Sequence, residues 1–143
     1  MSSDFLVNFG IGGNYRKWSG PGWSQDSDRD DFTWMLGHSA SLQFAFAPPA
    51  SDLTLTLRVM PVKGSTVEQS LFLYLNGRFV GFLTGSAVSD FSFPIPSGFF
   101  SSQAEKLNTL TFVAPNAIVP AKVGKSADQR CLSFGFLHLA IHE

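Results

Sequence analysis

The sequence is poor in cysteine, in clustered charge and in long apolar runs. Its 143 residues include one cysteine, Cys131, which excludes an internal disulfide and the paired cysteines of a zinc site. Ten basic residues stand against eleven acidic ones and form no cluster, so we expect no nucleic-acid partner. No apolar run approaches the roughly 20 residues that cross a bilayer, so we expect no membrane span.

Targeting and catalytic motifs are also missing. The N-terminus, Met1-Ser2-Ser3-Asp4, has no basic region followed by an apolar stretch, so we expect no secretory signal peptide. The protein would be cytoplasmic, or a domain cut from a larger cell-surface-associated parent. His138 and His142 have the spacing of a zinc pair, but they lie in a predicted strand and lack the glutamate of HExxH. We therefore expect a protein that is not an enzyme; a glycosidase with two facing carboxylates is the open alternative.

The sequence is rich in residues that build a core. Hydrophobic residues make up 44% of it, charged residues only 15%, and 15 residues are phenylalanine, a composition far from that of disordered chains. Alternation of apolar and polar residues predicts strands with one buried face, most clearly over Leu53–Val59. Gln69–Leu75 alternates in the same way and ends in Asn76-Gly77, a strong hairpin signal.

Further strands are predicted by the same reasoning, and turn-forming residues separate nearly all of them. They cover Phe5–Phe9, Ala40–Phe46, Arg78 or Phe79 to Leu83, Ser89–Ile95, Leu107–Val113 and Leu132–Ile141. In the last strand the apolar phase slips by one residue, which predicts a β-bulge near Phe136. No window has a helical period. We therefore predict one all-β domain over residues 1–143, a β-sandwich of jelly-roll (galactose-binding-like) type with about eight or nine antiparallel strands.

Two long segments interrupt this pattern, Gly10 to Asp31 and Ala114 to Arg130, and long loops often carry function. The first contains Trp18 and Trp23 among many glycines, and Trp34 follows it. Indole rings stack on sugars, and glycine lets a ligand approach the backbone closely, so this composition favours carbohydrate. The alternative is that these indoles close one end of the core.

Charged residues within the two loops have two interpretations each. Asp26, Asp28 and Asp30 are weak calcium candidates because carboxylates are hard oxygen ligands, although the spacing is not that of an EF-hand and a solvated acidic turn is the alternative. Asp128 and Arg130 are two residues apart, so on extended backbone they face the same side. The pair would fix the loop to the last strand or would bind sugar hydroxyls.

Three groups of motifs follow one another along the chain: Gly22-Trp23-Ser24 with Phe32-Thr33-Trp34, Gln69 to Gly77, and Leu110 through Asp128-Gln129-Arg130-Cys131-Leu132. Together they resemble a family of bacterial galactose-binding-like, jelly-roll domains that are associated with polysaccharide proteins and often appended to glycosyltransferases. The resemblance implies a β-sandwich and a link to carbohydrate.

These observations favour a non-catalytic carbohydrate-binding module that needs no cofactor, calcium apart, and binds a glycan at loops at one end of the sandwich. Its candidate residues are Trp18, Trp23, Trp34, Asn76, Arg78, Asp128 and Arg130. A structural domain that docks on a partner enzyme or forms a homo-oligomer is the alternative. Phe99-Phe100 motivates it, because two adjacent aromatics in a turn do not easily face one core.

Overall fold

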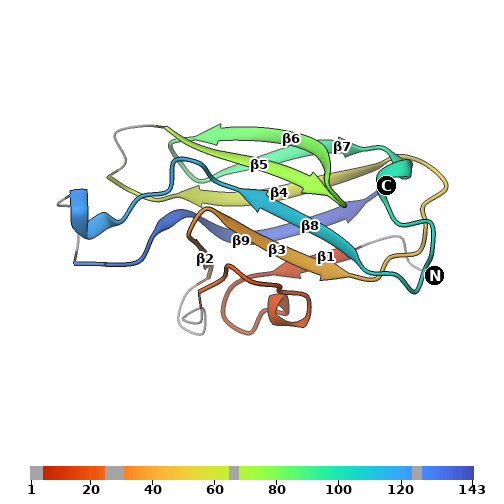
Figure 1. Cartoon of the computed structure of the whole chain (residues 1–143), viewed down its shortest axis with the longest axis horizontal. Helices are drawn as coiled ribbons and strands as arrows, with labels where there is room; N and C mark the ends of the chain where they lie inside the picture. The colour runs from red at the N-terminus through yellow and green to blue at the C-terminus, as the bar shows by residue number, and fades with distance from the viewer. Residues whose placement is uncertain (1–4, 25–30, 65–67, 124–126) are drawn as a thin grey trace.

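In the part of the chain that the structure describes, nine strands pack as two antiparallel sheets face to face (Figure 1). The structure is a computed structural model and describes residues 5–24, 31–64, 68–123 and 127–143. It confirms the predicted all-β sandwich. No helix in these ranges is long and apolar enough to cross a membrane.

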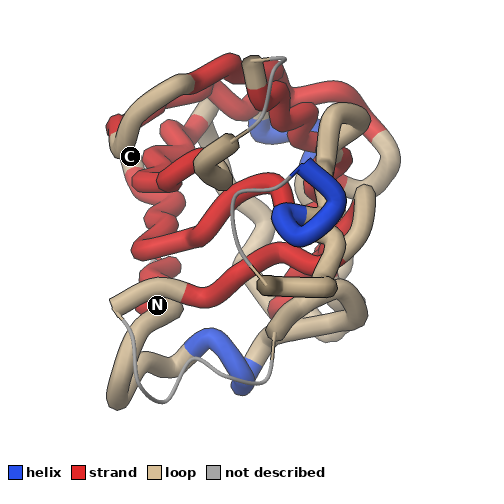
Figure 2. The backbone as a smooth tube through the Cα atoms, turned by 90° about the vertical axis from the view of Figure 1, so that its left-hand side faces the viewer, coloured by secondary structure: helices blue, strands red, loops and turns tan. Residues whose placement is uncertain are grey.

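The first sheet contains five strands and the second contains four. The order in the first is β1 (Phe5–Asn8), β9 (Leu132–His142), β4 (Leu53–Pro61) and β7 (Ser89–Ile95), and β2 (Thr33–Leu36) pairs with the first half of β9, beside β1. The order in the second is β3 (Ser39–Phe44), β8 (Asn108–Val113), β5 (Gln69–Leu75) and β6 (Arg78–Gly85). Short 3-10 helices form η1 (Tyr15–Lys17), η3 (Ser97–Phe99) and η4 (Pro120–Val123). Figure 2 views the sandwich from the end that carries η4.

The alternation of the sequence becomes the burial pattern of the strands. In β4 and β5 the aliphatic positions are buried and the intervening ones are half-buried. Asn76 and Gly77 join β5 to β6 with φ angles of 53° and 81°, which suit a tight hairpin turn. The predicted bulge is confirmed, since the register of β9 against β4 moves from His138 to Phe136 between Arg58 and Val59.

Strand β2 is the element that alternation did not predict. It has four residues, and its inward side chains are Thr33 and Met35, so a polar residue occupies a core position. The Thr33 hydroxyl donates a hydrogen bond to the Phe9 carbonyl, which removes the cost of burying it. A short strand with a satisfied buried threonine has no hydrophobic period to detect.

The indole of Trp23 is part of the hydrophobic core and is 5% exposed. Its ring centroid lies 4.9 Å from that of Phe136 on β9 and 6.0 Å from that of Phe112 on β8, so it contacts both sheets. Its Nε1 donates to the Ser41 carbonyl at 2.8 Å. Gly22 permits this insertion, because its φ is +102° and a Cβ there would lie 2.4 Å from the Ser39 carbonyl oxygen.

Gly22→Ala tests whether this entry into the core depends on glycine. We expect a loss of about 3 kcal/mol in the free energy of unfolding, from a left-handed φ combined with a backbone clash. Gly12→Ala is the matched control, since φ is +68° with nothing within 4 Å; it should cost about 1 kcal/mol. Chemical denaturation measures both, and equal losses would contradict the steric argument.

Candidate functional site

The three tryptophans lie in three different environments. Trp23 is enclosed in the core, where no ring face is open to a ligand. Trp18 is partly buried against the core, its ring centroid 4.9 Å from that of Phe5 on β1. Trp34 on β2 is partly exposed and lines a pocket. The structure therefore does not bring the three rings together.

The pocket beside Trp34 has a volume of about 350 Å³ and lies at the end of the sandwich where β4 ends and β9 begins. Apolar side chains form much of its wall, and Asp128 and Lys63 add a carboxylate and an ammonium. We call it the Trp34 pocket. Its described lining is Trp34, Met60, Pro61, Val62, Lys63, Pro120, Asp128 and Leu132. An aromatic ring, a carboxylate and a cation thus meet in one cavity.

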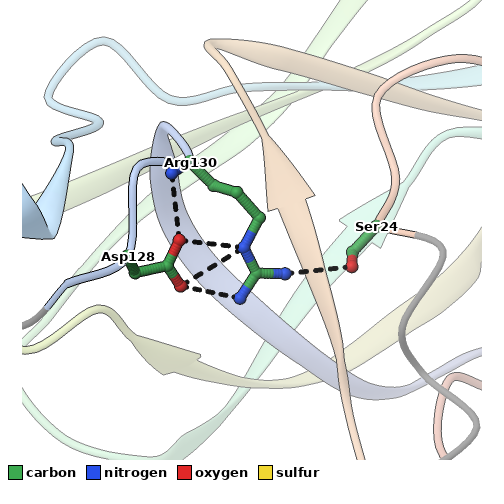
Figure 3. A network of polar contacts seen from close by, with 3 residues as sticks. All are labelled: Ser24, Asp128 and Arg130. Carbon is green, nitrogen blue, oxygen red and sulfur yellow. Dashed lines mark hydrogen bonds and ion pairs between the residues drawn. The ribbon is translucent and has the colours of Figure 1, made fainter.

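A network of hydrogen bonds fixes the carboxylate of this pocket (Figure 3). Two side-chain nitrogens of Arg130 donate hydrogen bonds to Asp128: Nη2 lies 2.7 Å from Oδ2 and Nε lies 3.0 Å from Oδ1. The backbone N–H of Arg130 also donates to Oδ1, at 2.9 Å. Nη1 of Arg130 donates to the buried hydroxyl of Ser24 at 3.2 Å. The guanidinium therefore ties the loop before β9 to the segment that follows Trp23.

The charge state of Asp128 follows from this geometry. The hydrogen bonds from the Arg130 side chain lower the pKa of the carboxyl below its ordinary value of 3.8, because they stabilise the charged form. The carboxylate is thus ionised at neutral pH and acts as a hydrogen-bond acceptor. Among the described residues of the pocket it is the single carboxylate, whereas general acid–base hydrolysis of a glycoside uses two.

Asn76 and Arg78 lie at the other end of the sandwich. They line a second pocket with residues 98–103 and 106–107, which precede β8, whereas the Trp34 pocket contains residues that follow β8. The six residues of β8 span about 20 Å, and this length separates the two pockets. In Figure 1 these two ends appear at the right and the left of β8. Asn76 and Arg78 therefore belong to a different site from Asp128 and Arg130.

The calcium candidates Asp26, Asp28 and Asp30 lie outside the described residues. Within the described ranges, no group of three histidine, cysteine, aspartate or glutamate side chains is placed to hold a metal ion.

Sequence reasoning missed two members of the site. Lys63 is exposed at the rim of the Trp34 pocket, just beyond the end of β4, and the strand pattern up to Val59 already indicated a loop there. The Ser24 hydroxyl accepts a hydrogen bond from Arg130, which lies 106 residues away in the sequence, and no local pattern encodes such a contact.

A cluster of aromatics on the outer side of the second sheet was also not predicted. The side chains of Phe72, Tyr74, Phe79 and Phe82 touch one another across β5 and β6, and Phe79 and Phe82 are 51% and 58% exposed. We call this the aromatic face. Aromatics in the outward positions of alternating strands were its sequence signal.

We expected one ring of Phe99-Phe100 to form a contact patch, but both rings pack at least partly against the core. Phe100 is buried and stacks on Phe46 with centroids 5.2 Å apart. Phe99 is partly buried against the core. The apolar surface of the second sheet is therefore the aromatic face.

Asp128→Asn tests the contribution of the Arg130 pair. At neutral pH we expect it to lower the free energy of unfolding by about 1 kcal/mol, since the pair is partly exposed. Because folding lowers the pKa, this stabilisation exists above pH 3.8 and is lost as pH falls through the folded-state pKa. Urea denaturation should show wild type and variant converging in acid, and a difference that is independent of pH would contradict the charged pair.

No family model and no curated protein sequence matches the chain. Solved structures do match it. They include the CBM36-1 domain of a multidomain xylanase from the hindgut metagenome of Trinervitermes trinervoides, with 14% identity, a TM-score of 0.52, and coverage of 98% of this chain and 97% of that chain.

The C-terminal CBM6 of the marine laminarinase LamC from Zobellia galactanivorans gives 7% identity, a TM-score of 0.55 and coverage of 98% and 99%. The CBM6cm-2 module of Cellvibrio mixtus lichenase 5A, solved with cellotriose, gives 10% identity, a TM-score of 0.51 and coverage of 100% and 98%. At these identities the likeness concerns the fold. The chain has the β-sandwich fold of carbohydrate-binding modules.

Proposed function

We propose that the protein is a non-catalytic carbohydrate-binding module whose ligand, a glycan or polysaccharide, occupies the Trp34 pocket. The observation that carries the proposal is that a partly exposed indole and an ionised carboxylate line one cavity at an end of the sandwich. An indole face packs on the apolar C–H face of a sugar ring. A carboxylate accepts hydrogen bonds from the adjacent hydroxyls.

The rigidity of the site supports this assignment. Asp128 keeps its position through Arg130. The Trp34 backbone pairs with Gly135 and accepts from the Ser24 N–H at 2.9 Å, and the Trp34 ring packs edge-on against Phe32 with centroids 5.1 Å apart. Binding then orders few side chains, which keeps the entropic cost low. A shallow, wet pocket still binds weakly, and we expect dissociation constants in the millimolar to micromolar range.

Trp34→Ala tests the stacking role. Isothermal titration of the full chain with cellotriose, xylohexaose and fragments of bacterial polysaccharides, with and without calcium, should find at least one ligand for wild type. Loss of the indole should weaken binding of that ligand about tenfold or more, since an aromatic ring that the bound ligand covers contributes a large share of the binding energy.

The matched control is Trp18→Ala, which removes a partly buried indole away from the Trp34 pocket and should leave the affinity unchanged. Circular dichroism shows whether both variants are folded. Absence of binding across the panel, or equal loss in the two variants, would overturn the proposal.

The aromatic face favours a second candidate function, self-association. Phe72 and Phe82 stack at 5.6 Å between centroids, and Phe79 contacts Tyr74 at 5.6 Å, which makes an uncharged apolar surface across paired strands β5 and β6. Contiguous apolar surface of this kind marks interaction sites. A second copy of the chain would cover it in an isologous contact.

Phe79→Ser combined with Phe82→Ser tests the dimer. If the face associates, sedimentation at high concentration should show a dimer for wild type and a monomer for the double variant, because each exposed ring contributes apolar burial. Leu6→Ser and Ile11→Ser, at exposed apolar residues outside the aromatic face, provide the control. A monomeric wild type at all concentrations would contradict self-association.

A further inference from the structure

We propose that the end of the sandwich opposite the Trp34 pocket carries a second ligand site, which binds a compact anionic group: the carboxylate, sulfate or phosphate substituent of a glycan. The site is a cavity of about 340 Å³ between the β5–β6 hairpin, η3 and the loop that leads into β8. Arg78 and Lys106 both line it, and its described lining contains no carboxylate. The inference does not depend on the function proposed for the Trp34 pocket.

The guanidinium of Arg78 is held in a way that suits an external anion. Its Cζ lies 5.7 Å from the centroid of the Phe99 ring, so an aromatic ring covers one face of the cation. The in-plane N–H donors of a guanidinium match carboxylate, sulfate and phosphate oxygens in pairs. Arg58 and Arg130 each pair with an aspartate, whereas in the described part of the chain no carboxylate lies within 4.0 Å of Arg78.

Asn76 gives the cavity a rigid wall. Its Nδ2 donates to the Phe99 carbonyl and to the Asn108 Oδ1, both at 2.9 Å, and its Oδ1 accepts from the Thr109 N–H at 2.9 Å. The buried Asn108 also accepts from the Ser101 N–H at 2.7 Å. These bonds join the hairpin, η3 and the loop before β8. Asn76 is therefore a positioning residue for Arg78 and not itself a ligand group.

Charge complementarity points to an anion. The whole chain has a net charge of -1, so two cations in one cavity are a local feature and not the result of a basic sequence. The hydroxyl of Ser102 and the amide of Gln103 add neutral polar groups to the same lining. Because Arg78 and Lys106 are exposed, their attraction for an anion is screened by salt. Binding should therefore be weak and should weaken further as ionic strength rises.

The test is an NMR titration of the full chain at low, constant ionic strength with sodium glucuronate, glucose 6-sulfate and glucose 6-phosphate, and with glucose as the neutral control. At least one anion should shift the amide resonances of residues 98–107 saturably, and glucose should not. Which anion binds most tightly identifies the substituent. The Trp34 indole resonance reports the other pocket separately, so failure at one site is distinguishable from failure at the other.

Arg78→Gln should weaken binding of that anion about tenfold or more, since it removes charge-assisted hydrogen bonds. Lys106→Gln should weaken it less, and Lys63→Gln, at the Trp34 pocket, should have no effect on residues 98–107. Saturable shifts that persist unchanged in Arg78→Gln, equal shifts with glucose, or no shift with any anion would overturn the proposal.

Discussion

Burial of the Trp23 indole between the two sheets is the constraint on which the rest of the structure depends. The ring contacts Phe136 of one sheet and Phe112 of the other, so it packs against both layers. Its neighbours in sequence, Gly22 and Ser24, form backbone hydrogen bonds to β2. The Gly22 carbonyl accepts from the Leu36 N–H at 2.7 Å, and the Ser24 N–H donates to the Trp34 carbonyl. The residues on either side of Trp23 are therefore hydrogen-bonded to the backbone of β2, at Trp34 and Leu36.

The same segment couples the core to the candidate site. Ser24 follows Trp23 directly, and its buried hydroxyl receives the Arg130 guanidinium that holds Asp128. A glycine, an indole and a serine in a row thus set the backbone angle, the core packing and the anchor of the polar network. The two ends of the sandwich differ in chemistry. One combines an indole with a carboxylate, and the other combines the cations of Arg78 and Lys106 with the ring of Phe99.

Much of the fold was predictable, because strands that bury one face leave a period of two in the sequence. The bounds of the strand Gln69–Leu75 and the hairpin after it followed from alternation and from Asn76-Gly77. Alternation did not predict strand β2, because Thr33 stands at a core position. For the site, the pairing of Asp128 with Arg130 followed from local spacing. The separation of Arg78 from that pair did not, because it depends on which ends of β5, β8 and β9 lie together.

The pocket lined by Trp34 and Asp128 is the central claim for function, and the most direct measurement locates a bound glycan by nuclear Overhauser effects. Spectra of the full chain with the best-binding oligosaccharide should show contacts between sugar ring protons and the Trp34 indole protons. Contacts of a saturably bound sugar with the Trp18 indole or with Phe79 and Phe82 alone, and none with Trp34, would contradict the account.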